Sequence, residues 1–176
     1  MLLVDLEKTT LLANVEVPVV IRSDRVRSVR YGALEFKLRK GLSVELPLRV
    51  AVPLIRSGAA DIDETRLPTH VDINKLRWKE ERSEDLQPVS SDFYIRARLY
   101  LNYLDKARES DKKAELLYRK TKAYVIDILR TRMKKIVRYA LSSMRPSREL
   151  LNRMSYEERV LYIELCNLLE EWYGAM

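Results

Sequence analysis

The sequence predicts an α+β fold, in which a small N-terminal β-rich domain over residues 1–65 precedes a larger all-α helical domain over residues 66–176. Alternating apolar and polar residues, which indicate half-buried strands, are clearest between residues 34 and 46. Apolar residues at helical spacing instead fill long segments of the second part, above all residues 111–145. The composition, 47% hydrophobic and 34% charged, is that of a folded chain, because disordered segments combine high charge with few apolar groups.

The first domain is expected to begin with a helical segment and two strands. Residues 2–13 contain leucines that suit a short helix. Residues 15–21 form a β-branched run interrupted by Pro18, and because proline has no N–H to donate to a sheet, the run predicts an edge strand. Residues 26–31 suggest a second strand, and Gly32 permits a turn after it.

The next segment has the pattern of a β-hairpin. Apolar and polar residues alternate over residues 34–38 and again over residues 42–46. Gly41 lies in the short connection, where a bulged hairpin requires a residue with positive φ. We therefore expect these two strands to pair within a single sheet, with all their apolar side chains on one face.

A short helix and a loop are expected to complete the first domain. Pro47 ends the preceding strand and suits the first position of a helix, which the apolar spacing extends over residues 48–55. Pro53 is the weak point of this helix, and Gly58 stops it. The acidic and polar segment from residue 61 to residue 68 predicts a connecting loop.

Four helices are predicted in the second domain, over residues 72–79, 93–104, 111–145 and 156–172. Asp72 is the expected N-cap of the first, and Ser91 or Asp92 caps the second. Ser155 and Glu158 have the spacing of a capping box, which places the start of the last helix between them.

The helix over residues 111–145 organises the chain, because it contains no glycine or proline and spans roughly 50 Å at 1.5 Å per residue. Its first apolar stripe consists of Leu117, Thr121, Val125, Ile128, Ile136 and Ala140. Its second apolar stripe consists of Ile126, Leu129, Met133, Val137, Leu141 and Met144. A helix at the edge of a small domain needs only one apolar stripe, so a helix with two must be covered on both sides. We expect a partner protein to supply part of that cover.

Candidate interface residues follow from the same helical faces. They are Tyr94, Leu101, Tyr118, Val125, Ile128, Leu129, Met133 and Ile136. Tyrosine is included because it is enriched at interfaces, where its ring buries area and its hydroxyl finds a partner. Spacing alone leaves open which stripe faces the chain's own helices and which faces a neighbour.

The net charge of +7 is concentrated on the long helix. Residues 111–145 carry 11 basic and 3 acidic groups, whereas residues 146–176 carry 3 basic and 6 acidic groups. The basic face comprises Arg119, Lys120, Arg130, Lys134, Lys135 and Arg138. We favour a solvated face that pairs with the acidic tail over a nucleic-acid site, since no recognition-helix signature or aromatic stacking series accompanies these residues. Direct DNA contact is therefore expected to be weak, with Arg130, Lys134, Lys135 and Arg138 as its candidates.

The sequence predicts no active site, cofactor, metal site or small-molecule substrate. It lacks a glycine-rich phosphate loop, and His70 and Cys166 are its single histidine and cysteine. Asp61, Asp63 and Glu64 lack the glycine and terminal glutamate of a calcium loop, so a solvated loop is the better interpretation. Without a signal peptide or an apolar run of about 18 residues, the chain is expected to be intracellular and to have no contact with membranes.

One motif resembles a known family. It consists of Gly41, Val44, Leu46, Pro47, Leu48 and Ala51. Its spacing resembles the pattern Gly-x-x-Val-x-Val/Leu-Pro-Leu-Trp-Leu/Val-Ala of subunits of the GINS DNA-replication complex. Asp72, Pro88 and the pair Phe93–Tyr94 follow in an order that is also similar to that family.

The resemblance implies a non-catalytic subunit of the type in which the β domain precedes the helical domain, as in the archaeal counterpart of the second and third eukaryotic subunits. It implies a heterotetramer with the helix-first GINS subunit, and a role with the MCM helicase and a RecJ-like companion in the replicative helicase. Such a subunit would be associated with the chromosome, in the nucleus if the source is a eukaryote. The alternative is a free-standing, basic, helical nucleic-acid-binding protein.

Overall fold

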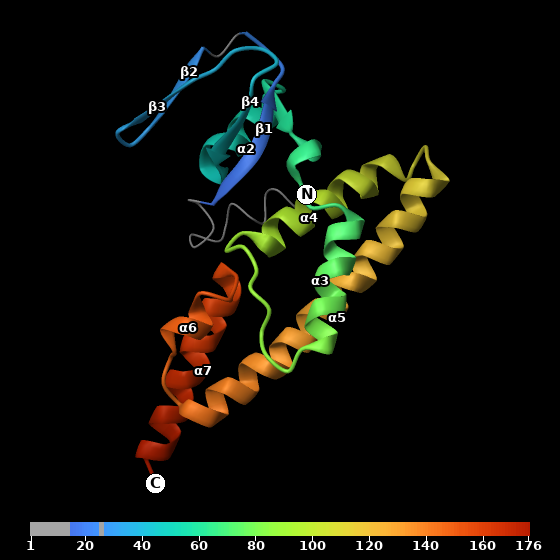
Figure 1. Cartoon of the computed structure of the whole chain (residues 1–176). Coiled ribbons are helices and arrows are strands. Elements are labelled where there is room, and N and C mark those ends of the chain that lie inside the picture. Colours follow the sequence, from blue (N-terminus) through green and yellow to red (C-terminus); the bar gives the residue numbers. More distant parts are fainter. Residues whose placement is uncertain (1–14, 25–26) are drawn as a thin grey trace. The chain divides into compact units, whose positions relative to one another are not determined.

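The computed structural model describes residues 15–24 and 27–176, which divide into two units between Leu67 and Pro68 (Figure 1). Among the described residues, the first unit contains the strands and a short helix, and the second is helical. The predicted α+β class, with the β part first, is confirmed. The segment over residues 2–13, for which a short helix was expected, lies outside the described residues.

The first unit is built on β1 (Glu16–Ile21), which is the central strand of a three-stranded antiparallel sheet. It pairs with β4 (Ser43–Pro47) on one side and with β5 (Ala60–Ile62) on the other. The prediction of an edge strand is therefore wrong. The backbone of Pro18 points toward β5 at the place where that strand has ended, and only its carbonyl is used, accepting from the Asp63 N–H at 3.0 Å. The missing N–H consequently costs no hydrogen bond of the sheet.

The predicted hairpin between residues 34–38 and 42–46 is also wrong. β3 (Leu34–Lys37) pairs with β2 (Ser28–Tyr31) in a separate two-stranded ribbon, while β4 pairs with β1. Gly32, at φ +59°, makes the tight turn that joins the ribbon strands. The alternation identified both strands but not their partners, because each strand fits any neighbour of the same period. The described part of the unit thus has two sheets instead of the single one expected.

The helix α2 (Leu48–Arg56) completes the first unit, as predicted. It packs on the three-stranded sheet, and its buried residues are Leu48, Val50, Ala51, Val52 and Leu54. Gly58, at φ +70°, lets the chain leave the helix, with its N–H donating to the Ile55 carbonyl. The strand β5 was missed within the predicted loop, because three residues are too few to show an alternation. It is followed by a 3₁₀ turn, η2 (Glu64–Arg66).

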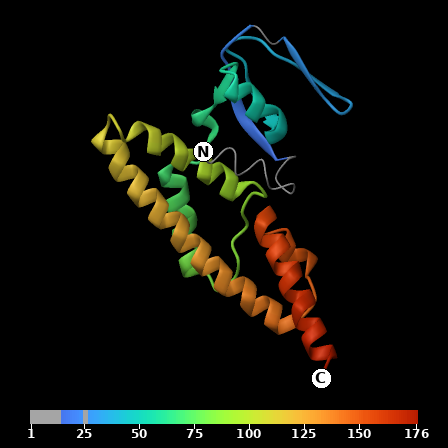
Figure 2. The ribbon, with the colours of Figure 1, turned by 180° about the vertical axis from the view of Figure 1, so that it is seen from behind.

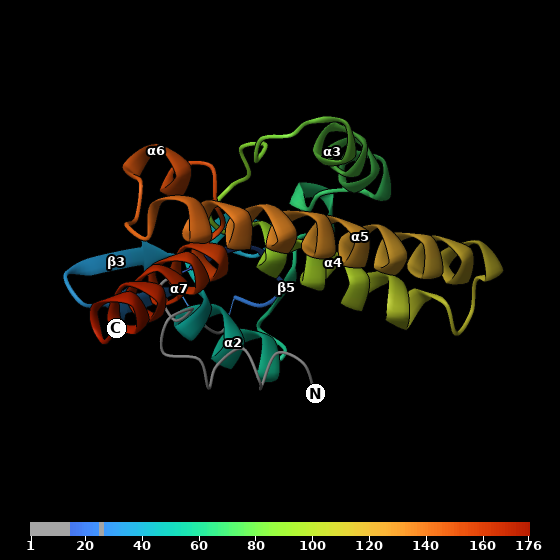
Figure 3. The same cartoon turned by 90° about the horizontal axis from the view of Figure 1, so that it is seen from below.

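In the second unit every other long helix packs against α5 (Lys112–Ser143). The helices α3 (His70–Arg82), α4 (Phe93–Ala107) and α7 (Tyr156–Gly174) contact it, and α6 (Arg148–Leu151) lies in the connection before α7. Figure 3 shows α3 on one side of α5, and α4 and α7 on the other. A core cluster at the C-terminal half of α5 comprises Leu86, Ile136, Ala140, Met154, Tyr162 and Cys166.

The helix starts agree with the sequence prediction to within one residue except at α3, whereas the C-terminal ends differ from it by two or three residues. Ser155 and Glu158 form the predicted capping box of α7, and Asp92 occupies the N-cap position of α4 without a side-chain cap hydrogen bond. The N-cap of α3 is Thr69 instead of Asp72, which occupies the third helical position and completes a capping box with Thr69. The sequence Thr-x-x-Asp allows both assignments, and the one with two reciprocal hydrogen bonds is formed.

We expect Thr69→Ala to lower the free energy of unfolding of the second unit by about 1 kcal/mol, because it removes the hydroxyl that accepts from the Asp72 N–H. Urea unfolding followed by circular dichroism measures the change. Ser142→Ala, an exposed change on α5, is the control and should alter the free energy by less than about 0.5 kcal/mol.

The same pair predicts a pH dependence. Hydrogen bonds from Thr69 hold the pKa of Asp72 below its ordinary value of 3.8, so their contribution is complete above that pH and is lost as the pH falls through the lowered pKa. The stability difference between the wild type and Thr69→Ala should therefore shrink in acid. An unchanged difference down to pH 2 would contradict the assignment of the capping box.

Candidate partner-binding groove

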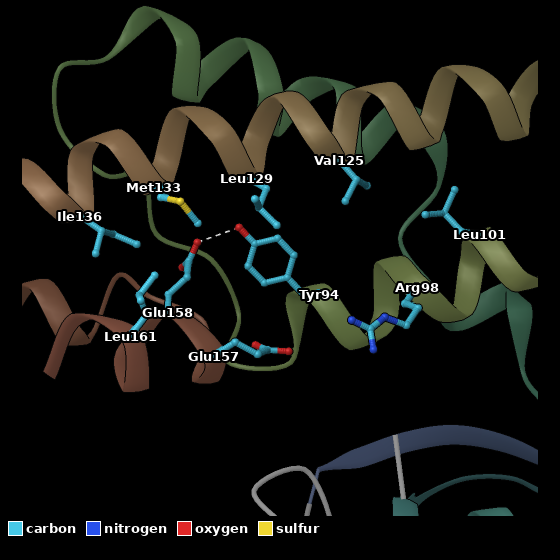
Figure 4. Close-up of a pocket in the computed structure, with 10 residues that line it drawn as sticks. All are labelled: Tyr94, Arg98, Leu101, Val125, Leu129, Met133, Ile136, Glu157, Glu158 and Leu161. Carbon is cyan, nitrogen blue, oxygen red and sulfur yellow. Dashed lines mark hydrogen bonds between the residues drawn. The ribbon is translucent and has the colours of Figure 1, made fainter. Parts of the chain in front are cut away.

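An open groove of about 340 Å³ lies between α4, α5 and α7 in the second unit (Figure 4). It is lined by Tyr94, Arg98, Leu101, Val125, Leu129, Met133, Ile136, Glu157, Glu158 and Leu161. Six of the eight candidate interface residues line it: Tyr94, Leu101, Val125, Leu129, Met133 and Ile136. The structure thus brings together residues that the sequence predicted only as members of separate helices.

The wall supplied by α5 is apolar because of its helical spacing. Val125, Leu129 and Met133 recur every four residues, so they lie on one side of the helix and point into the groove (Figure 4). Leu101 of α4 and Leu161 of α7 supply apolar side chains from the other helices. An apolar groove with few polar groups is typical of a site that binds another apolar surface.

The polar end of the groove is made by Tyr94 and Glu158. The Tyr94 hydroxyl donates to Glu158 Oε1 at 2.7 Å, as drawn in Figure 4. Burial, together with the negative charge of Glu158, raises the pKa of Tyr94 well above its ordinary value, so the hydroxyl keeps its proton. The tyrosine ring is therefore held in one position against the groove.

Glu158 is itself held by Arg132, a fully buried arginine of α5. Arg132 Nε donates to Glu158 Oε1 at 2.7 Å and Nη2 donates to Oε2 at 2.9 Å, which is a bidentate pair. Nη1 donates to Glu80 Oε2 at 2.9 Å and to the Gln87 carbonyl at 2.7 Å, and Nη2 also donates to the Arg153 carbonyl at 3.0 Å. All five N–H groups of the guanidinium are therefore used.

A second buried cation completes this network. Lys135 Nζ donates to Glu80 Oε1 at 2.6 Å and to the carbonyls of Glu80 and Asp85 at 2.7 and 3.0 Å. The Arg132 network, defined as Arg132, Lys135, Glu80 and Glu158, thus contains two cations and two carboxylates. Burial works against the charge of Arg132, but its bonds to Glu158 and Glu80 outweigh this effect and raise its pKa.

The network bears on the predicted basic face of the long helix. Lys135 is buried, so its assignment to a solvated basic face was wrong. Arg138 is exposed but donates to the Glu84 carbonyl at 2.7 Å, whereas Arg130 and Lys134 are exposed. The expected pairing of that face with the acidic tail is not seen among the described residues, because Arg119 pairs with Glu115 and Lys135 with Glu80. The tail is contacted instead by Arg132, through Glu158, and by Arg145, which lies beyond α5 and is 3.7 Å from Glu170.

Arg132, Glu80 and Glu158 are the residues of this region whose roles the sequence analysis missed. A signal was present, because Ile128, Arg132 and Ile136 follow one another at intervals of four residues on the buried face of α5. A charged residue in a buried stripe requires a charged partner. Nothing local indicated that this partner would come from α3 and α7.

The two apolar stripes of α5 have different environments. Ile128 and Ile136 of the first stripe are 0% and 1% exposed, so the chain itself buries them, and we leave them out of the candidate contact surface. Five members of the second stripe, Ile126, Leu129, Met133, Val137 and Leu141, are between 38% and 54% exposed. Tyr118 lies outside the groove, with the guanidinium of Arg108 4.7 Å from its ring centroid. Soluble monomers rarely leave a contiguous apolar surface of this kind uncovered, so it indicates an interaction site.

No chemistry emerges at the other residues that the sequence singled out. His70 is the first residue of α3, and Cys166 is buried in the core, where burial raises the pKa of its thiol. Asp63 accepts hydrogen bonds from Ser43 and Thr65, which hold its pKa below the ordinary value, and Asp61 pairs with Arg22. Within residues 15–24 and 27–176, no three His, Cys, Asp or Glu side chains are grouped to hold a metal ion.

The part of the chain that the structure describes contains no helix long and apolar enough to cross a membrane.

Comparisons with known proteins point to one family. A family model described as Sld5, the GINS complex protein helical bundle domain, matches residues 69–176. The match begins at Thr69, the N-cap of α3, and runs past the end of α7, so it covers the four long helices of the second unit, including the three that line the groove. A comparison with curated proteins found no match.

We expect Arg132→Met to destabilise the second unit by about 3–5 kcal/mol, because it leaves two buried carboxylates with one cation between them. Urea unfolding of the variant and the wild type measures this loss. Arg130→Met, which removes the same charge from an exposed position on α5, is the matched control and should change the free energy by less than about 0.5 kcal/mol. Equal effects of the two substitutions would show that the Arg132 network does not hold the helices together.

Proposed function

The chain belongs to the GINS complex protein family, and from this premise we propose that it is a non-catalytic scaffold subunit that activates the replicative helicase. Membership makes it a subunit of a DNA-replication complex, with other GINS subunits as its partners. We infer that its companion is the helix-first GINS subunit in a heterotetramer, and that the assembly contacts the MCM helicase and a RecJ-like protein. Association with the chromosome follows from that role.

The observation that supports a scaffold is the uncovered apolar surface of the helical unit. The groove and the second stripe of α5 lie side by side, since Leu129 and Met133 belong to both. Burying apolar area contributes roughly 25 cal/mol per Å², so a partner helix that covers this surface would gain most of its affinity from it. The candidate interface is accordingly Tyr94, Leu101, Val125, Leu129 and Met133, extended by the exposed remainder of the stripe.

The groove also supplies features that orient a partner. Arg98 projects from α4 and Glu157 from α7, so opposite charges border the apolar wall (Figure 4). Charged groups at a rim contribute more to the orientation of a partner than to affinity. We infer that the docked element is an amphipathic helix whose flanks carry charges opposite to those of Arg98 and Glu157.

We also infer that the two units are separate domains of the subunit, divided as the sequence predicts near residue 65. Each has its own buried residues, with Val17, Val19 and Leu46 in the first and Ile128 and Ile136 in the second. The helical domain would form the contacts within the complex, leaving the β-rich domain for other partners.

The alternative of a free-standing nucleic-acid-binding helix has less support. Of its four candidate residues, Lys135 is buried in an ion pair with Glu80, and Arg138 donates a hydrogen bond to the Glu84 carbonyl. A helical site for phosphates would need its cations at the surface.

We expect Leu129→Glu and Met133→Glu each to weaken binding to the helix-first GINS subunit at least tenfold, because the complex would bury an unpaired carboxylate. Co-purification and isothermal titration with the full-length partner measure the effect. Leu116→Glu is the matched control: it places the same charge on an exposed leucine of α5 outside the groove and should leave assembly unchanged. Normal assembly of both groove variants, with wild-type circular dichroism, would exclude the groove as the interface.

A further inference from the structure

The β2–β3 ribbon of the first unit has no role in the proposed scaffold. Its strands hydrogen-bond with each other and not with the three-stranded sheet. Figure 2 shows the ribbon extending away from that sheet. An isolated two-stranded hairpin is marginally stable in water, so a ribbon that extends in this way gains from contact with another molecule.

The strand register divides the ribbon into two faces. Val29 lies opposite Phe36, and Tyr31 lies opposite Leu34, so these four side chains share one face. Leu34 is 60% exposed and the other three are half-buried. The opposite face carries Ser28, Arg30, Glu35 and Lys37. One face is therefore apolar, with two aromatic rings, and the other is charged.

The ribbon and its flanks hold most of the basic charge of the first unit. Residues 22–40 contain seven basic and two acidic residues, a net charge of +5, whereas the rest of residues 1–67 has a net charge of −3. Arg22 pairs with Asp61, and Arg30 lies opposite Glu35. Arg27, Lys37, Arg39 and Lys40 are exposed and form no ion pair with any residue that the structure describes. Positive charge is thus concentrated on the ribbon and the residues that flank it.

We propose that the β2–β3 ribbon binds single-stranded nucleic acid. Phe36 and Tyr31 would stack on unpaired bases, and Arg27, Lys37, Arg39 and Lys40 would contact the phosphates. Sites for single strands combine aromatic rings on a β surface with flanking cations, and both features occur here within 14 residues of sequence. A duplex offers no unstacked base to the rings. A protein partner would account for the apolar face but would not account for the local excess of cations.

The test measures fluorescence anisotropy of a labelled 20-nucleotide oligothymidine titrated with the full chain at 50–200 mM NaCl. Phe36→Leu keeps apolar area in the ribbon and removes the ring, and it should weaken binding about fivefold to tenfold. Lys37→Ala combined with Arg39→Ala should reduce the slope of log affinity against log salt by about 1.4, since each phosphate contact on a single strand contributes about 0.7.

The control is Arg130→Ala combined with Lys134→Ala, which removes two exposed cations from α5 and should leave affinity and slope unchanged. Equal losses from both pairs would overturn the proposal, as would equal affinity for a duplex of the same length or no binding at 50 mM salt. Loss of the GINS partner but not of DNA in Phe36→Leu would assign the face to protein and overturn it as well. Leu129→Glu should retain DNA binding, so failure of this site and failure of the scaffold role are separable.

Discussion

The helical unit depends on one buried arginine. Arg132 occupies a position in α5 where the spacing of its neighbours calls for an apolar side chain, and it uses all five N–H groups on Glu80, Glu158 and two carbonyls. A buried ion pair contributes little net stability compared with well-packed apolar residues, but removing one partner is costly. The Arg132 network therefore acts less as a source of stability than as a constraint, because α3, α5 and α7 must meet in the one arrangement that satisfies every donor.

That constraint extends to the surface proposed to bind partners. Glu158 accepts from Arg132 and also from Tyr94, so the polar end of the groove is positioned by the same charges that join the helices. With its first stripe and the network facing inward, α5 keeps its second stripe exposed among the described residues. The exposed apolar surface proposed as the interface is thus a consequence of which side of α5 the buried hydrogen bonds and ion pairs face. Family membership explains why such a surface is tolerated, since the subunit works within a complex.

The β-rich unit is held together differently, by apolar packing between its sheet and α2. Its three-stranded sheet and α2 bury Val17, Val19, Leu46 and Leu48 completely or nearly so, and these residues include two positions of the family motif. The motif is therefore explained by packing, while its Arg49 is exposed. The ribbon adds no strand to this sheet and instead concentrates basic and aromatic side chains.

Local features of the sequence determined the helices, their caps and the presence of two apolar stripes on α5. Hydrogen bonds within a helix and at its ends join residues a few positions apart, so spacing reports them directly. Only the tertiary structure decided which strands pair, which stripe is buried and which cations face inward. Pro18 could lie in a central strand because β5 ends beside it. Lys135 is buried instead of exposed because its ammonium group pairs with the buried carboxylate of Glu80, 55 positions away. Such choices depend on groups distant in sequence, and a period of two or 3.6 residues carries no information about them.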